Sequence, residues 1–301
     1  MVNPRAPNPV LGIFWMLVTG MCFVAVTALV KYMGARIPAP ESAFLRYMIG
    51  LVFLIPLLRP LLRARPTARQ WRLFGIRGLA HGIGVMLWFF AMTQIPIAEV
   101  TAMNYLAPVY VTIGAALFLG ERLAARRIAA VVMALIGALI ILRPGFREVD
   151  PGHVAMLFAG LVFGVSYLLA KVLADELPPS LVVAMLSIIV TIVLAPFAIA
   201  VWVTPTLVEL ALLLTVAFFA TAGHYTMTLA LRAAPVTVTQ PVTFLQLVWA
   251  TALGAIVFGE AVDVWVVLGG SLILASVTFI AWREAMVRRR HITPTTPETK
   301  L

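Results

Sequence analysis

Residues 91–121 read AMTQIPIAEVTAMNYLAPVYVTIGAALFLGE, and residues 230–260 read ALRAAPVTVTQPVTFLQLVWATALGAIVFGE. Without a gap, the two stretches share eight residues at a constant spacing of 139 positions. The matching residues are Ala91, Pro96, Leu106, Val109, Thr112, Ala116, Gly120 and Glu121 with Ala230, Pro235, Leu245, Val248, Thr251, Ala255, Gly259 and Glu260. An apolar composition could produce scattered Leu and Val matches, but it would not place proline and a Gly-Glu pair at one spacing.

The segments that precede these stretches also repeat, at a spacing of 140 positions. Gly12, Leu17, Gly20, Phe23, Lys31, Pro38 and Pro56 match Gly152, Leu157, Gly160, Phe163, Lys171, Pro178 and Pro196. The chain therefore consists of two copies of one unit. In a membrane protein, such an internal repeat is typical of a secondary transporter.

Composition places the chain in a membrane. Of its 301 residues, 62% are hydrophobic and only 11% are charged, whereas a soluble domain carries about 25% charged residues. Several charge-free runs exceed the roughly 20 residues that a helix needs to cross a bilayer. The formal charge of +10 does not indicate a nucleic-acid partner, because the basic residues lie in short loops and in the tail. The single cysteine, Cys22, rules out a disulfide framework.

Hydropathy and turn residues predict an all-α integral membrane protein with ten transmembrane helices, arranged as a 5+5 inverted repeat. The first repeat covers residues 9–143, the second covers 152–284, and residues 285–301 form a disordered cytoplasmic tail. The expected helices are 9–33, 42–62, 70–93, 97–119, 124–143, 152–174, 180–202, 206–232, 236–258 and 263–284. Prolines mark many of the corners, because a helix commonly ends before an X-Pro step.

The positive-inside rule predicts that both termini are cytoplasmic. With that orientation, sixteen of the 22 basic residues fall on the cytoplasmic side and four on the outer side. An odd number of helices per repeat means that the second copy enters the membrane from the opposite side. One sequence unit can then build two gates, one at each face of the bilayer.

The Pro96…Gly120-Glu121 and Pro235…Gly259-Glu260 segments resemble the drug/metabolite transporter superfamily, and in particular its EamA-type members. These have two five-helix domains, each with a proline before its fourth helix and a Gly-Glu at that helix's end. The resemblance covers residues 10 to 284. It implies a central cavity lined mainly by helices one, three, four, six, eight and nine. Arg77-Gly78 and the 91–121 stretch resemble a bacterial subgroup near which S-adenosylmethionine, riboflavin and amino acids are known substrates.

Polar residues predicted at mid-membrane are the candidates for the cavity wall, since polar groups are costly there. The fourth helix presents a polar face, and the ninth presents another at matching depth. These cavity candidates are Thr101, Asn104, Tyr105, Gln240, Thr243 and Gln246, with Tyr167 and Trp249 as deep aromatic residues that could stack on a substrate. For each polar residue alone, hydrogen bonding between helices is slightly favoured, and for the aromatic residues packing is as good an explanation. The polar set is favoured as a cavity wall, because both repeats place polar residues at matching depth. Pro241 is expected to free backbone carbonyls at this depth.

Arg77, His81 and Trp88 share one face of the third helix. Arg77 could hold a substrate carboxylate or phosphate, or could extend to the cytoplasmic interface. His81 and His224 could exchange a proton, but an imidazole satisfied between helices is the more common case.

A second group of residues is predicted to act in gates or corners. Lys31 and Lys171 occupy one repeat position, where a lysine complements a helix C-terminus or supplies a gate charge. Glu121 and Glu260 are read as corner residues, each following a Gly that ends one helix and favouring the first turn of the next helix. Pro96 and Pro235 begin the fourth and ninth helices. Glu99 is expected to complement an N-terminal dipole, with proton binding left open.

These observations favour a secondary transporter of small polar metabolites, such as amino acids, in the bacterial inner membrane, with export as the expected direction. Uptake of a cofactor-like metabolite such as S-adenosylmethionine or riboflavin is the alternative. A membrane enzyme acting on lipid-linked substrates is more remote, because the twelve acidic residues are dispersed. No catalytic residue, metal or cofactor is predicted. Membrane lipid, a small-molecule substrate and a coupling proton are the expected partners of a monomer or weak dimer.

Overall fold

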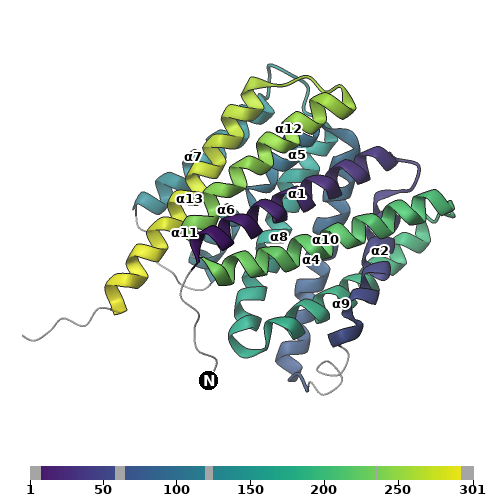
Figure 1. Cartoon of the computed structure of the whole chain (residues 1–301), viewed down its shortest axis with the longest axis horizontal. Coiled ribbons are helices and arrows are strands. Elements are labelled where there is room, and N and C mark those ends of the chain that lie inside the picture. Colours follow the sequence, from purple (N-terminus) through teal and green to yellow (C-terminus); the bar gives the residue numbers. More distant parts are fainter. Residues whose placement is uncertain (1–7, 58–64, 119–124, 235, 293–301) are drawn as a thin grey trace, which may run out of the picture.

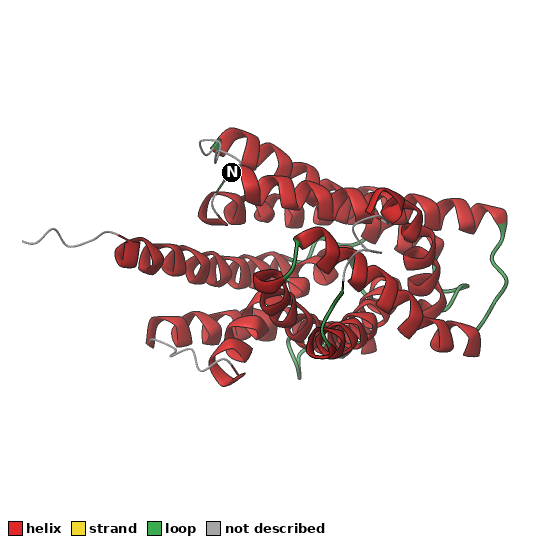
Figure 2. Cartoon of the chain, turned by 90° about the horizontal axis from the view of Figure 1, so that it is seen from below, coloured by secondary structure: helices red, strands yellow, loops and turns green. Residues whose placement is uncertain are grey.

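The computed structural model describes residues 8–57, 65–118, 125–234 and 236–292. These residues form helices packed side by side in one bundle (Figure 1). Figure 2 shows the bundle from below, with loops joining the helices and no strand in the described part of the chain.

Ten membrane crossings can be followed through this bundle. The uninterrupted ones are α1 (Pro9–Met33), α4 (Ala68–Gln94), α7 (Ala125–Leu142), α8 (Pro151–Glu176), α9 (Pro179–Ala200), α10 (Leu207–Ala233) and α13 (Val264–Ile292). The second crossing is α2 (Ala39–Gly50) followed by the 3₁₀ helix η1 (Leu51–Leu57), and the fourth is α5 (Ile97–Asn104) followed by α6 (Ala107–Phe118). The ninth consists of α11 (Val236–Thr239), the 3₁₀ helix η2 (Gln240–Thr243) and α12 (Phe244–Phe258).

Within the described residues, eight helices are long and apolar enough to cross a membrane. The ten-helix fold predicted from the sequence is confirmed. Prolines cap the N-termini of α2, α5 and α9, at Pro38, Pro96 and Pro178.

Among the boundaries that the structure describes, two differ from the predicted ones by three residues or more. α2 begins at Ala39 rather than at residue 42. α13 continues to Ile292, so the tail predicted at 285–301 begins inside a helix. Hydropathy reports only the membrane-embedded part of a helix, whereas the Ala, Met and Arg residues that follow it favour helix in water as well.

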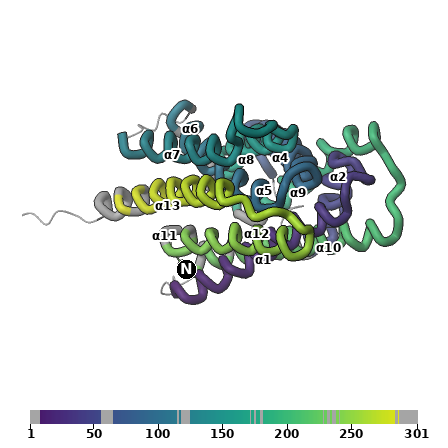
Figure 3. Tube along the Cα trace, turned by 90° about the horizontal axis from the view of Figure 1, so that it is seen from above, coloured from purple at the N-terminus to yellow at the C-terminus, as the bar shows by residue number. Residues whose placement is uncertain are grey.

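The packing of the helices shows the two-fold relation between the repeats. α1 packs on α10, and its repeat counterpart α8 packs on α4, the counterpart of α10. α2 and α7 instead pack against their own counterparts, α9 and α13. Figure 3 shows α1 beside α10 and α12, and α7 beside α13. The repeats therefore interlock and do not form two separate halves.

Close approach of backbones explains one pair of repeated glycines. A Cβ at Gly12 would lie 2.3 Å from the Cβ of Ala234, and a Cβ at Gly152 would lie 2.9 Å from both Gln94 Cβ and Ile95 Cγ2. Ile95 is the first-repeat counterpart of Ala234, and Gln94 directly precedes it. Each repeat thus seats the start of its first helix against a corner of the other repeat, where a side chain would not fit.

The bundle has two ends, which are called the Lys31 end and the Asn8 end after residues that lie there. The Lys31 end carries the connections at residues 34–38, 95–96, 143–150, 201–206 and 259–263. The Asn8 end carries the start of α1, the α8–α9 connection and the end of α13.

Candidate functional site

The fourth and ninth crossings are interrupted at equivalent positions of the two repeats. α5 ends at Asn104, and η2 ends at Thr243, which is the repeat counterpart of Asn104. The two interruptions touch, because the hydroxyl of Tyr105 donates a hydrogen bond to the carbonyl oxygen of Thr243 over 2.9 Å. The two interruptions therefore meet at a contact between the repeats.

Prolines account for both interruptions. Pro108 has no N–H to offer the carbonyl of Asn104, and the chain turns there with a short-range bond from Leu106 N to Met103 O at 3.0 Å. Pro241 lies inside η2, as expected from the sequence. Irregular backbone at membrane depth is tolerated where it is buried in protein or lines a water-filled space.

The predicted polar face of the fourth crossing is only partly available. Thr101 is buried, whereas Asn104 and Tyr105 are partly exposed. On the ninth crossing, Gln246 and Trp249 are partly exposed, and both lie next to Gly20 of α1. The structure therefore brings Tyr105 and Thr243 together, and places Gln246 and Trp249 against α1.

A second polar cluster surrounds His81 in the interior of the bundle. Its Nε2 lies 2.9 Å from the hydroxyl of Tyr47 on α2, and its Nδ1 lies 3.2 Å from the hydroxyl of Ser166 on α8. Phe163 and Tyr167 stack on each other beside the imidazole. His81 thus bridges three helices from both repeats, as the structural alternative predicts.

Arg77 lies one turn before His81 and is only 6% exposed. Its NH1 donates to the carbonyl oxygen of Val182 on α9 over 2.9 Å, so the guanidinium is buried between helices and does not extend to the interface. His224 contacts the edge of Phe23 at 5.2 Å between ring centroids. Trp88 packs on the main apolar core.

The sequence reasoning missed four members of this cluster: Arg46, Tyr47, Phe163 and Ser166. Arg46 is 8% exposed, and its guanidinium lies 4.1 Å from the centre of the Tyr47 ring. The available signal was a charged residue inside an apolar run, which is itself a mark of function in a membrane helix. Tyr47 and Ser166 have no such signal.

At the Lys31 end, an ion pair joins the two repeats. Lys31 pairs with Glu260 and also donates to the carbonyl oxygen of Ile95 over 2.9 Å. The other carboxylate oxygen of Glu260 accepts from the backbone N–H of Ile97 over 3.0 Å. Glu260 was read as a corner residue that favours the first turn of the next helix, but α13 starts only at Val264. Its carboxylate instead caps α5 of the other repeat, where free N–H groups attract an anion.

Glu99 belongs to a buried charge cluster at the same end. It is 3% exposed, accepts from both terminal nitrogens of Arg147 at 2.9 Å, and contacts His153. The hydrogen bonds that Arg147 donates to Glu99 raise the pKa of the Arg147 guanidinium above its ordinary value. Arg143 pairs with Asp263 beside this cluster. The Glu99 carboxylate is therefore occupied by partners that the sequence reasoning did not name.

Several predicted residues cannot be placed. Glu121 and Pro235 lie outside the described residues, and the side chains of Lys171 and Gln240 are not described. The structure therefore places one half of each predicted gate or corner pair, namely Lys31, Glu260 and Pro96.

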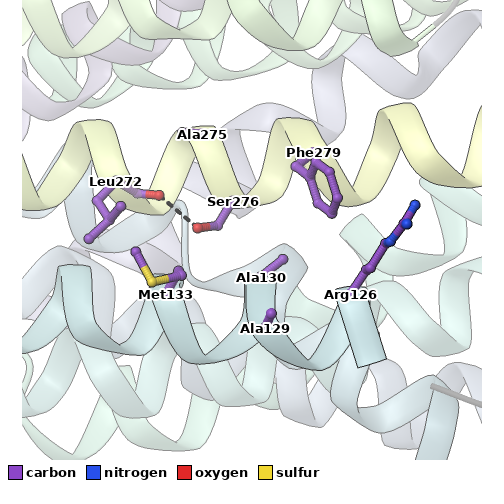
Figure 4. A pocket seen from close by; sticks show the side chains of 8 residues that line it. All are labelled: Arg126, Ala129, Ala130, Met133, Leu272, Ala275, Ser276 and Phe279. Carbon is purple, nitrogen blue, oxygen red and sulfur yellow. Dashed lines mark hydrogen bonds between the residues drawn. The ribbon is translucent and has the colours of Figure 1, made fainter. Parts of the chain in front are cut away.

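An apolar groove between α7 and α13 lies apart from these clusters (Figure 4). It is lined by Arg126, Ala129, Ala130, Met133, Leu272, Ala275, Ser276 and Phe279. Arg126 lies at one end of the groove, and the Ser276 hydroxyl donates to the Leu272 carbonyl over 2.8 Å. Among the side chains that the structure describes, no group of His, Cys, Asp and Glu could hold a metal ion.

Comparison with known proteins gives a match to both repeats. The profile of the EamA-like transporter family matches residues 10–143 and again residues 150–282. A riboflavin transporter of Rhizobium johnstonii is 30% identical over 285 residues, which cover 93% of this chain and 94% of that protein. An S-adenosylmethionine uptake transporter of Rickettsia bellii is 25% identical, with 94% and 97% coverage.

One of the relatives is named as an exporter. The pseudopaline exporter CntI of Pseudomonas aeruginosa is 26% identical, with 88% of this chain and 94% of that protein covered. A solved crystal structure aligns with a TM-score of 0.58 at 19% identity, covering 94% of this chain and 98% of its own. That likeness concerns the fold alone.

Proposed function

Because the chain belongs to the EamA-like transporter family, we propose that it is a secondary active transporter that moves a small polar metabolite across the bacterial cytoplasmic membrane by alternating access. The observation that carries the proposal is the contact between the two interrupted crossings at Tyr105 and Thr243. Discontinuous helices that meet at a repeat interface are where secondary transporters bind their cargo.

The ion pairs support a conformation that is closed at the Lys31 end. Lys31–Glu260, Arg36–Glu209 and Arg143–Asp263 each join one repeat to the other there. In the proposed orientation this is the periplasmic end. The cargo site would then communicate with the cytoplasm in this state, and opening the Lys31 end would require these pairs to separate.

Uptake is the direction that the relatives favour over the export expected from the sequence. Relatives named as S-adenosylmethionine uptake transporters cover more than nine tenths of this chain. The pseudopaline exporter keeps export as the second candidate. Proton coupling through His81 or Glu99 remains a proposal, supported by the burial of both side chains.

Counterflow in proteoliposomes tests this function through Tyr105→Phe. The wild-type protein should exchange at least one solute of a panel of amino acids, S-adenosylmethionine, riboflavin and flavin mononucleotide. Loss of the hydroxyl removes the hydrogen bond to the Thr243 carbonyl, at a cost of about 0.5–1.5 kcal/mol, and should slow exchange severalfold.

Tyr110→Phe is the matched control, because Tyr110 packs against Gly160 and Gly164 and makes no hydrogen bond through its hydroxyl within the described structure. It should exchange at the wild-type rate. Absence of exchange for every solute by wild-type protein would refute the proposed function.

The orientation is tested by labelling single cysteines in intact cells, with Cys22 replaced by serine. Phe146 is 93% exposed in the connection between α7 and α8, so Phe146→Cys should react with a membrane-impermeant maleimide. Arg290→Cys, near the end of α13, should react only after the cells are permeabilised. Reaction of position 290 in intact cells would invert the proposed topology.

A further inference from the structure

Among the side chains that the structure describes, two arginines in the interior of the bundle have no acidic partner. Arg46 on α2 and Arg77 on α4 are 8% and 6% exposed. Every ion pair found in the described part of the chain involves other residues, at the two ends of the bundle. Arg46 contacts the face of Tyr47, and Arg77 contacts the Val182 carbonyl.

The Arg77 guanidinium is also incompletely hydrogen-bonded. Its Nε is buried and has no partner, although a guanidinium offers five N–H donors in a fixed fork. A buried donor left without an acceptor is costly, and a buried charge without a counter-charge is more so. The guanidinium of Arg77 therefore has a buried N–H donor without an acceptor in the described protein.

Both arginines lie well inside their helices. Arg46 is seven residues into α2 from the Lys31 end, and Arg77 is nine residues into α4 from the Asn8 end. At 1.5 Å per residue these positions are about 10 and 14 Å from the helix ends. Arg46 contacts Tyr47, whose hydroxyl lies 2.9 Å from His81 Nε2, and Arg77 lies one helical turn before His81, so both arginines lie near His81. A long side chain reaching the interface does not explain two buried guanidiniums around one centre.

The same region offers a place for a flat organic group. Tyr167 stacks on Phe163 next to His81, yet it keeps 41% of its surface exposed. Because His81 lies one helical turn from Arg77, this ring provides apolar area near that arginine. Such a surface binds the body of a ligand while a polar group fixes its orientation.

We propose that the cargo carries an anionic group, a carboxylate or a phosphate, which the free donors of Arg77 bind within the positive field of Arg46. The assignment rests on the proposed transport function and narrows its substrate class. It excludes cargo that is purely cationic, since no carboxylate faces these arginines among the described side chains. Arg77 binds the anion directly, while Arg46, held on Tyr47, acts at longer range.

Matched ligands that differ by one anionic group test the assignment on purified full-length protein. The probes are flavin mononucleotide against riboflavin for a phosphate, and S-adenosylmethionine against its decarboxylated form for a carboxylate. Isothermal titration should show that the anionic member of at least one pair binds at least about tenfold more tightly, as expected for a charge-assisted hydrogen bond. The pair that responds identifies the kind of anion.

Arg77→Met should reduce that preference to less than about twofold, and Arg77→Lys should restore part of it, because lysine keeps the charge but not the fork. Arg69→Met is the control for net charge, since Arg69 lies on the same helix in an exposed pair with Glu176. It should keep the wild-type preference. If the methionine variant does not fold, the wild-type preference and the lysine variant still decide.

Three results would overturn the assignment: equal or tighter binding of the members that lack the anionic group, binding of none of the four probes, or an unchanged preference in Arg77→Met. Counterflow separates this failure from failure of the proposed function. Exchange of a neutral or cationic solute alone would uphold transport and reject the anionic cargo. Anion binding without exchange of any solute would do the reverse.

Discussion

Lys31→Met is expected to lower the rate of counterflow by at least about tenfold. The pair with Glu260 is largely buried, with side-chain exposures of 19% and 12%, and removing one partner of a buried pair costs about 3–5 kcal/mol. That cost falls on the conformation closed at the Lys31 end, where Glu260 also holds the first N–H of α5. A transporter that cannot populate one of its two states cannot complete its cycle.

The exchange Lys31→Glu with Glu260→Lys should recover a measurable part of the lost rate, because it restores an ion pair although not the cap on α5. The pair of Arg69 and Glu176 at the Asn8 end is the control. It is more exposed, at 58% and 34%, and exposed pairs contribute about 0–1 kcal/mol, so Arg69→Met should change the rate little. Wild-type rates in Lys31→Met would show that the pair is not part of a gate.

Gly137→Leu is expected to prevent stable assembly of the bundle. A Cβ at this position would lie 2.7 Å from the backbone oxygen of Gly269 and 2.8 Å from Ile273 Cγ1. Likewise, a Cβ at Gly269 would lie 2.5 Å from the backbone oxygen of Gly137. The helices α7 and α13 therefore touch backbone to backbone, as small residues permit in membranes. Overpacking costs about 1–3 kcal/mol when side chains can adjust, and a backbone oxygen has less freedom to move.

The measurement is the apparent melting temperature and the size-exclusion profile in detergent. Gly75→Ala on α4 is the control, because a Cβ there would meet nothing within 4 Å, and alanine favours helix over glycine. It should leave the melting temperature unchanged or higher. A monodisperse Gly137→Leu protein with the wild-type melting temperature would contradict the observed packing of α7 on α13.

The interruptions of the fourth and ninth crossings illustrate how far the sequence could lead. Pro241 was expected to free carbonyls, because a missing N–H is a local property that can be read from one residue. That Tyr105 would donate to the carbonyl of Thr243 could not be foreseen. The two residues are 138 positions apart, and their contact depends on how the repeats cross.

Charged residues also separate what the sequence predicts from what only the tertiary structure decides. The repeat identified Lys31 and Glu260 as gate or corner residues. From the sequence, however, Lys31 was expected to complement the end of its own helix, and Glu260 the start of the helix that follows it. The structure pairs them with each other and uses Glu260 to cap α5. A carboxylate binds whichever free N–H groups lie nearest in space, and spacing along the chain does not report that distance.

The sequence by itself determined the membrane environment, the ten crossings and the two-fold repeat, because hydropathy, proline positions and identical residues at one spacing are local or periodic properties. Only the tertiary structure decided that Arg46 and Arg77 face one region around His81, and that the Lys31 end is tied between repeats. The physical reason is that a buried charge acquires its role from the groups around it. Those groups come from helices whose order in space follows from backbone contacts such as Gly12 with Ala234.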